Sequence, residues 1–143
     1  MILNKVAAMN TSGVSCDSLI ARFELIPKHV NADLQLVHRG KWLTADIIVV
    51  IGTVRFLLRV ENGKLIELTR QFALFHACDL FIQGTLQAWE KFWMKEPPPG
   101  WHDIFSLHKR GEMVVEGDTQ KFFANLQYLK DVFEMPRHFD VKT

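Results

Sequence analysis

The sequence is short of the features that mark several classes of protein. It has two cysteines, Cys16 and Cys78, which are too few for a disulfide framework or a thiol-rich zinc site. Its 17 basic and 16 acidic residues leave a formal net charge of +1, so nucleic acid is not an expected partner. It has no long apolar run, because Arg55 and Arg59 interrupt the most apolar stretch, residues 47–60, and this argues against a membrane-spanning helix. No basic region followed by an apolar stretch marks a secretory signal near the start, and we therefore expect a cytoplasmic protein.

What is present is the composition of an ordinary globular domain. Of the 143 residues, 48% are hydrophobic and 23% are charged, which argues against disorder. This length suits one domain. We predict a single domain over residues 17–143, preceded by a segment of residues 1–16 in which no periodicity predicts an element. Three consecutive prolines, Pro97–Pro99, predict a rigid loop inside that domain.

The pattern of apolar residues predicts both helices and strands. Alternation of apolar and polar side chains, or a short apolar run, predicts strands over residues 44–51, 53–60, 64–69, 78–83 and 112–116. Helical spacing predicts helices over residues 17–26 and 28–38, from Thr85 to Met94, between Asp103 and Gly111, and over residues 118–135. The first strand is apolar on both faces, so both faces should be covered. This order predicts an α+β domain with a five-stranded, mainly antiparallel sheet covered by helices.

Patterns that would indicate catalysis or metal binding are weak. The six histidines form none of the spaced metal-binding motifs. The nearest cluster is His102, Asp103 and His108, and positions five apart on a helix point to different faces. Cys78 follows His76 by two residues, but a small buried hydrophobe is the favoured interpretation of this thiol. We therefore predict no metal, no cofactor and no catalytic residue.

Aromatic side chains are concentrated between residues 89 and 133. At helical spacing they are typical of a core built from large side chains. Large, stiff side chains also line cavities, and an apolar cavity binds an apolar ligand through the area removed from water. The spacing alone leaves a solid core and a cavity open as alternatives.

Five segments, taken in order, carry a resemblance to a known family. A strand–Asn-Gly-Lys–strand hairpin is followed by a short strand, a helix with an aromatic anchor, a Gly-strand-Gly segment and a final helix. In this chain these segments are Val60-Glu61-Asn62-Gly63-Lys64, Ala77–Ile82, Thr85–Met94 with Trp89, Gly111–Asp118, and a helix with Phe122, Leu126 and Leu129. In this order and spacing, the chain from about Val60 to Leu129 resembles the sterol carrier protein family of non-specific lipid-transfer domains. It departs from the family in Lys95–Arg110, which is longer and carries the three prolines.

The resemblance implies a sheet and helices that enclose an apolar tunnel and carry no catalytic residues. Members of the family bind fatty acids, fatty acyl-CoA, sterols or phospholipids. The implied function is therefore non-catalytic binding and transfer or presentation of a lipid. By position on the matching helices, the tunnel would be lined by Trp89, Trp93, Phe105, Phe122, Leu126 and Leu129. We expect a lipid partner and transient contact with membranes. The two-faced first strand and the helical aromatics are compatible with a homodimer, and the sequence leaves the oligomeric state open.

Two other classes of function stay open at the level of sequence. The first is a small, cone-shaped α+β enzyme with a buried base beside an apolar pocket, for which Asp46, Asp79 and His76 are the candidates. Asp46 directed into the pocket would favour this hypothesis, and Asp46 in solvent would weaken it. The second is a protein-interaction module that exposes Trp101 and Phe105 as a patch.

Overall fold

The Asn62-Gly63 pair forms the turn that its sequence predicts. Asn62 has a φ of 50° and Gly63 a φ of 84°, and positive φ at both central residues is typical of a type I′ hairpin turn. The turn joins β2 (Val54–Glu61) to β3 (Lys64–Thr69) as an antiparallel pair. These elements belong to a computed structural model that describes residues 16–139, so the prediction for the N-terminal segment falls, apart from Cys16, outside the described residues.

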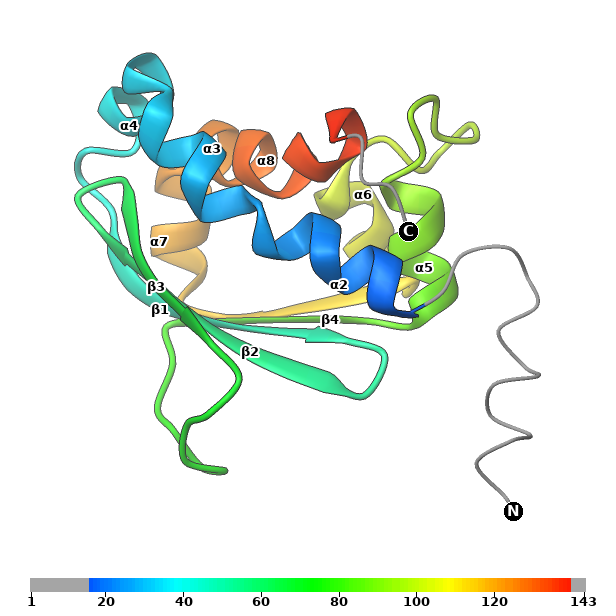
Figure 1. The fold of residues 1–143 in the computed structure, drawn as a ribbon, viewed down its shortest axis with the longest axis horizontal. Coiled ribbons are helices and arrows are strands. Elements are labelled where there is room, and N and C mark those ends of the chain that lie inside the picture. Colours follow the sequence, from blue (N-terminus) through cyan, green and yellow to red (C-terminus); the bar gives the residue numbers. More distant parts are fainter. Residues whose placement is uncertain (1–15, 140–143) are drawn as a thin grey trace.

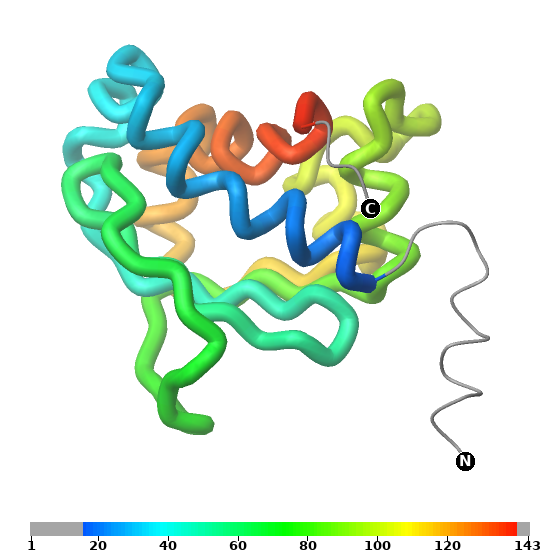
Figure 2. Tube along the Cα trace, viewed as in Figure 1, coloured from blue at the N-terminus to red at the C-terminus, as the bar shows by residue number. Residues whose placement is uncertain are grey.

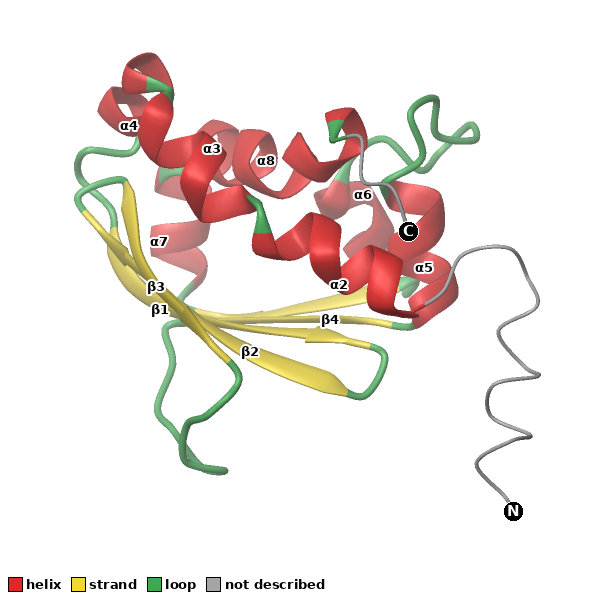
Figure 3. Cartoon of the chain, viewed as in Figure 1, coloured by secondary structure: helices red, strands yellow, loops and turns green. Residues whose placement is uncertain are grey.

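The sheet has five strands, in the order β3-β2-β1-β4-β5 (Figure 1, Figure 3). The remaining strands are β1 (Thr44–Ile51), β4 (Leu80–Gly84) and β5 (Met113–Gly117). Only the β1–β4 pair is parallel, so the predicted mainly antiparallel sheet is confirmed. Pairing of β4 with β1 begins at Leu80, opposite Ile47. Cys78 is an exposed loop residue, so the prediction that placed it inside this strand and the interpretation of its thiol as a small buried hydrophobe were both wrong.

The helices that the structure describes lie over one face of this sheet (Figure 1). They are α2 (Cys16–Glu24), α3 (Ile26–Ala32), α4 (Leu34–Arg39), α5 (Leu86–Phe92), α6 (Ile104–Lys109), α7 (Thr119–Ala124), α8 (Leu126–Glu134) and the 3-10 helix η1 (Met135–His138). Because α3 contacts both β3 and α8, the first and last helices form one layer over the sheet (Figure 2). The main core lies between the two layers, where Ile47, Val49 and Ile51 of β1 are completely buried.

Two of the predicted helices are each divided into two. At Asp33 a new helix begins because the side chain accepts a hydrogen bond from Leu36 N at 3.1 Å and so caps α4. Asn125 separates α7 from α8, and its side-chain Nδ2 donates to Lys121 O at 3.0 Å. In both cases a short polar side chain forms a hydrogen bond with a nearby backbone group and interrupts the helix. The apolar periodicity of the sequence continues past this residue, so the interruption was not predicted.

Strand β1 is buried on both faces, as its sequence predicts. On the face away from the helices, Ile48 and Val50 form a small second cluster with Leu57, and Phe72 and Phe81 pack against it. The segment between β3 and β4, which contains Phe72, extends from this side of the sheet (Figure 1). The cover on the outer face is therefore provided in part by the chain's own loop.

Candidate functional site

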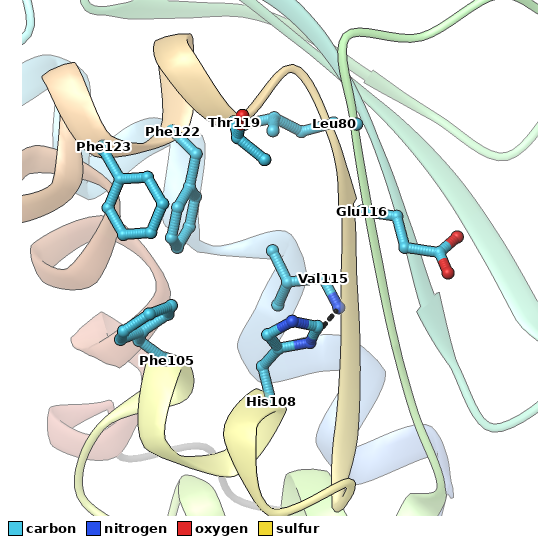
Figure 4. Close-up of a pocket in the computed structure, with 9 residues that line it drawn as sticks. Leu80, Phe105, His108, Val115, Glu116, Thr119, Phe122 and Phe123 are labelled. Carbon is cyan, nitrogen blue, oxygen red and sulfur yellow. Dashed lines mark hydrogen bonds between the residues drawn. The ribbon is translucent and has the colours of Figure 1, made fainter.

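A small apolar pocket lies between strands β4 and β5 and helices α6 and α7 (Figure 4). Its volume is about 70 Å³. It is lined by Leu80, Phe105, His108, Val115, Glu116, Gly117, Thr119, Phe122 and Phe123. Three phenyl rings dominate it, because the ring centroid of Phe105 lies 6.0 Å from that of Phe122 and 5.2 Å from that of Phe123. Phe123 is 52% exposed, so the aromatic wall of the pocket continues to the surface of the molecule.

Local sequence signals bring these rings together. Asp103 caps α6 by accepting from Phe105 N at 2.9 Å, and Asp118 caps α7 by accepting from Lys121 N at 3.0 Å. Gly117, between β5 and α7, has a φ of 121°, and a Cβ at this position would lie 2.2 Å from Asp79 O. Only glycine therefore allows β5 to end against β4 and α7 to begin beside the pocket.

Few polar side chains surround the pocket, and not all of them face it. His108 Nδ1 accepts a hydrogen bond from Val115 N at 3.1 Å, and the imidazole stacks on Phe105 with ring centroids 6.4 Å apart. Figure 4 shows Glu116 pointing away from the pocket, on the other side of β5. His108 and Thr119 are therefore the polar side chains at the pocket wall.

Trp89 and Trp93, which the resemblance assigns to the tunnel, are completely buried in the main core. The indole Nε1 of Trp89 donates to Val50 O at 3.0 Å, and that of Trp93 donates to Phe133 O at 2.7 Å. Their ring centroids are 4.6 Å apart. Both side chains therefore have hydrogen-bond partners and dense packing without any ligand.

The other four predicted residues take two positions. Phe105 and Phe122 are brought together at the pocket. Leu129 is buried, and Leu126, half-buried, packs against the same core. The prediction missed further lining side chains on the neighbouring strands and helices, namely Leu80, His108, Val115, Thr119 and Phe123. Of these, Phe123 could have been found from its place next to Phe122.

The candidate acid–base residues lie away from this pocket. Asp46 points to the outer face of the sheet, where it accepts from Arg59 Nε at 3.2 Å and lies 3.0 Å from His76 Nε2. Burial raises the pKa of Asp46, but hydrogen bonds from His76 and Arg59 outweigh it and hold the pKa below its usual value. Asp79 accepts from Asp46 N at 2.8 Å and from Lys121 Nζ at 3.1 Å. Asp46 is thus an ion-paired group on the outer face, and the enzyme hypothesis loses the observation that would favour it.

Cysteine and metal chemistry find little support in residues 16–139. Although Cys78 is an exposed residue, partial desolvation of its sulfur raises the pKa of the thiol, and the charge of Asp79 raises it further, which disfavours a reactive thiolate. Within the same residues, no three His, Cys, Asp or Glu side chains are close enough together to hold a metal ion. Nor is any helix in this part of the chain long and apolar enough to cross a membrane.

The predicted patch of Trp101 and Phe105 is not an exposed surface. Both residues are half-buried and pack against the main core. Lys91 Nζ lies 4.9 Å from the Trp101 ring centroid, and the Arg110 guanidinium lies 5.5 Å from it. Two cations therefore cover the indole, and Phe105 belongs to the pocket wall.

Comparisons by sequence and by structure give different results. No family model matches the chain, and no curated protein sequence matches it. Among solved structures, a crystal structure of sterol carrier protein 2 has a TM-score of 0.64 at 12% identity, covering 84% of this chain and 96% of that chain. A protein described as the UbiJ-SCP2 ubiquinone synthesis protein has a TM-score of 0.54 at 14% identity, covering 82% of this chain and 89% of its own. Apo sterol carrier protein 2 of Yarrowia lipolytica has a TM-score of 0.50 at 12% identity, covering 82% of this chain and 90% of that chain.

The chain therefore has the fold of sterol carrier protein 2. The resemblance that the order of sequence motifs indicates is confirmed as a likeness of fold over most of the chain.

Proposed function

We propose that this protein binds a lipid without catalysis and transfers or presents it, with an acyl chain entering between α6, α7 and β5. The observation that carries the proposal is the pocket formed by Phe105, Phe122 and Phe123, which joins the core to the surface through an exposed ring. The names of structures with the same fold support it, because two of them are sterol carrier proteins. The placement of the Asp46–His76 pair on the opposite face of the sheet supports the absence of catalysis at this site.

The pocket must enlarge to hold an acyl chain. A cavity of about 150 Å³ holds benzene, so 70 Å³ is too small for a long hydrocarbon. Helix α7 is the element we expect to move, because it has six residues and is separated from α8 at Asn125. Outward movement of α7 would extend the pocket toward Leu126 and Leu129, which belong to the same core cluster as Phe122.

Burial of the ligand provides the free energy for this opening. Each methylene removed from water contributes about 0.8 kcal/mol, so ten of them contribute roughly 8 kcal/mol before the cost of association. A deeper chain would contact Trp89 and Trp93, the remaining residues assigned to the tunnel. Release to a membrane would take place at the same opening, where Phe123 is exposed.

The first test is native mass spectrometry of the purified protein, followed by extraction of bound molecules under denaturing conditions. Near-stoichiometric release of a fatty acid or phospholipid would support the proposal directly. If the protein is purified without ligand, titration with dodecanoate should show one bound molecule per chain. Absence of both a co-purified lipid and dodecanoate binding would refute the proposal.

A matched pair of variants tests the place of binding. Phe123→Glu puts a charge at the opening and should weaken dodecanoate binding at least about tenfold, because a carboxylate there must be desolvated beside the chain. Phe75→Glu is the control, since Phe75 is 92% exposed in the loop on the other face of the sheet. Isothermal titration calorimetry on both variants should show weaker binding for Phe123→Glu only. Equal affinities for the two variants would place the ligand elsewhere.

A further inference from the structure

His108 has one ring nitrogen engaged by the main chain. Its Nδ1 accepts a hydrogen bond from Val115 N at 3.1 Å. A backbone N–H can only donate, so this nitrogen carries no proton, and the neutral ring must hold its proton on Nε2. The contact between α6 and β5 therefore fixes the tautomer of this side chain.

The other nitrogen, Nε2, is a hydrogen-bond donor at the pocket. Within residues 16–139 it has no protein acceptor, and the ring lies at the pocket wall together with Val115 and Phe105 (Figure 4). A polar donor that becomes buried beside an apolar ligand costs free energy unless the ligand provides an acceptor. The preferred ligand should therefore carry a hydrogen-bond acceptor near one end of its apolar part.

A cation close to the pocket favours an anionic acceptor. Lys109 Nζ lies 5.7 Å from the Phe105 ring centroid, at the same end of α6 as His108. The carboxylate of Glu116 points to the other side of β5 (Figure 4). The ammonium of Lys109 offsets the partial negative charge at the C-terminus of α6.

We propose that the site selects lipids that end in a carboxylate, and that His108 Nε2 donates a hydrogen bond to that carboxylate with Lys109 close by. This inference rests on the proposed function, because it names the headgroup of the lipid that the same pocket takes. In this arrangement the acyl chain passes Phe105 and Phe122 toward the core, while the carboxylate stays at the end of α6. A neutral lipid of equal length would bury the same apolar area and lack the charge-assisted hydrogen bond.

The test compares dodecanoate with 1-dodecanol by calorimetry at neutral pH. The unmodified protein should bind dodecanoate about tenfold more tightly, the effect of one charge-assisted hydrogen bond of roughly 1.4 kcal/mol. His108→Asn keeps a side-chain oxygen that can accept from Val115 N but has no donor at the position of Nε2. It should lower the ratio of the two affinities, because dodecanoate loses a charge-assisted hydrogen bond whereas dodecanol loses only a weaker neutral one. His38→Asn, at an exposed histidine of α4, is the matched control and should leave the ratio unchanged.

The outcomes separate the two proposals. If neither ligand binds the unmodified protein, the proposed function itself fails. If both ligands bind and His108→Asn leaves their ratio unchanged, the headgroup assignment alone is overturned. A second readout is the ¹⁵N resonance of His108 Nε2, which should shift with dodecanoate and much less with dodecanol. Equal shifts with the two ligands would also overturn the assignment.

Discussion

Enlarging Val115 should stabilise the protein and block its ligand at the same time. Val115 lines the pocket from the inner face of β5, so a larger side chain at this position fills the space. An empty cavity lowers the free energy of unfolding by about 24 cal/mol per Å³, so the 70 Å³ pocket lowers it by at most about 1.7 kcal/mol. Val115→Leu should recover part of this, and Val115→Phe should approach the limit unless the ring is forced out of a favourable rotamer.

The assay combines thermal and urea unfolding with dodecanoate titration. At the upper limit the midpoint of thermal unfolding would rise by about 5 °C for a domain of this size. Dodecanoate binding should fall in the order Val, Leu, Phe. Val114→Phe is the matched control, because Val114 is the neighbouring residue on the outer face of β5 and is 37% exposed. This control should change neither the stability nor the affinity for dodecanoate by much.

One result would refute this reasoning. If Val115→Phe unfolds at the same or a higher urea concentration and binds dodecanoate as tightly as the unmodified protein, the ligand does not enter at this pocket. A lower stability for both Val115→Leu and Val115→Phe would show instead that the space does not exist in solution.

Two further predictions concern stability. Arg137 is 9% exposed and donates to Phe92 O at 3.0 and 2.7 Å, so Arg137→Met should leave this carbonyl unsatisfied and cost about 2–3 kcal/mol in urea unfolding. For Asp46, burial raises the pKa, but hydrogen bonds from His76 and Arg59 lower it to below the ordinary value. The stability that ionised Asp46 contributes is therefore present above the pKa of this residue in the unfolded chain, and it is lost as the pH falls through its pKa in the folded protein. Asp46→Asn should lower the free energy of unfolding at neutral pH and make it depend less steeply on pH in acid. If its slope against pH in acid is unchanged, the lowered pKa of Asp46 is contradicted.

Much of the fold could be predicted because its signals are local. The hairpin at Asn62-Gly63 depends on two neighbouring residues, and the Asp118 cap depends on a hydrogen bond to Lys121 N. The parallel pairing of β1 with β4 depends on residues more than thirty positions apart, such as Ile47 and Leu80, and no local pattern encodes it. The same pairing decides where β4 begins.

Cys78 shows the limit of periodicity. The alternation of apolar residues continues back from Leu80 to Cys78, but the backbone N–H and carbonyl of Asp79 form hydrogen bonds with other residues. Asp79 N donates to Asp46 O at 2.8 Å, and Asp79 O accepts from Asp118 N at 2.7 Å. The strand therefore begins after these contacts, and Cys78 remains exposed.

The candidate site could be predicted in part for the same reason. Phe105 and Phe122 lie on the apolar faces of short helices, where spacing indicates them. Trp89 has the same spacing, but its indole N–H donates a hydrogen bond to the carbonyl of Val50 in β1, and the sequence does not reveal that partner. The role of His108 depends on Val115, which lies beyond the turn that joins α6 to β5, and no metal or catalytic motif includes this pair.

The most direct test of lipid binding at this pocket is a ¹H–¹⁵N correlation spectrum recorded during titration with dodecanoate. The account predicts saturable shifts at Val115, Phe122 and Phe123, with little change in the loop around Phe75. Saturable shifts centred on that outer loop, or no saturable shifts at all, would contradict it.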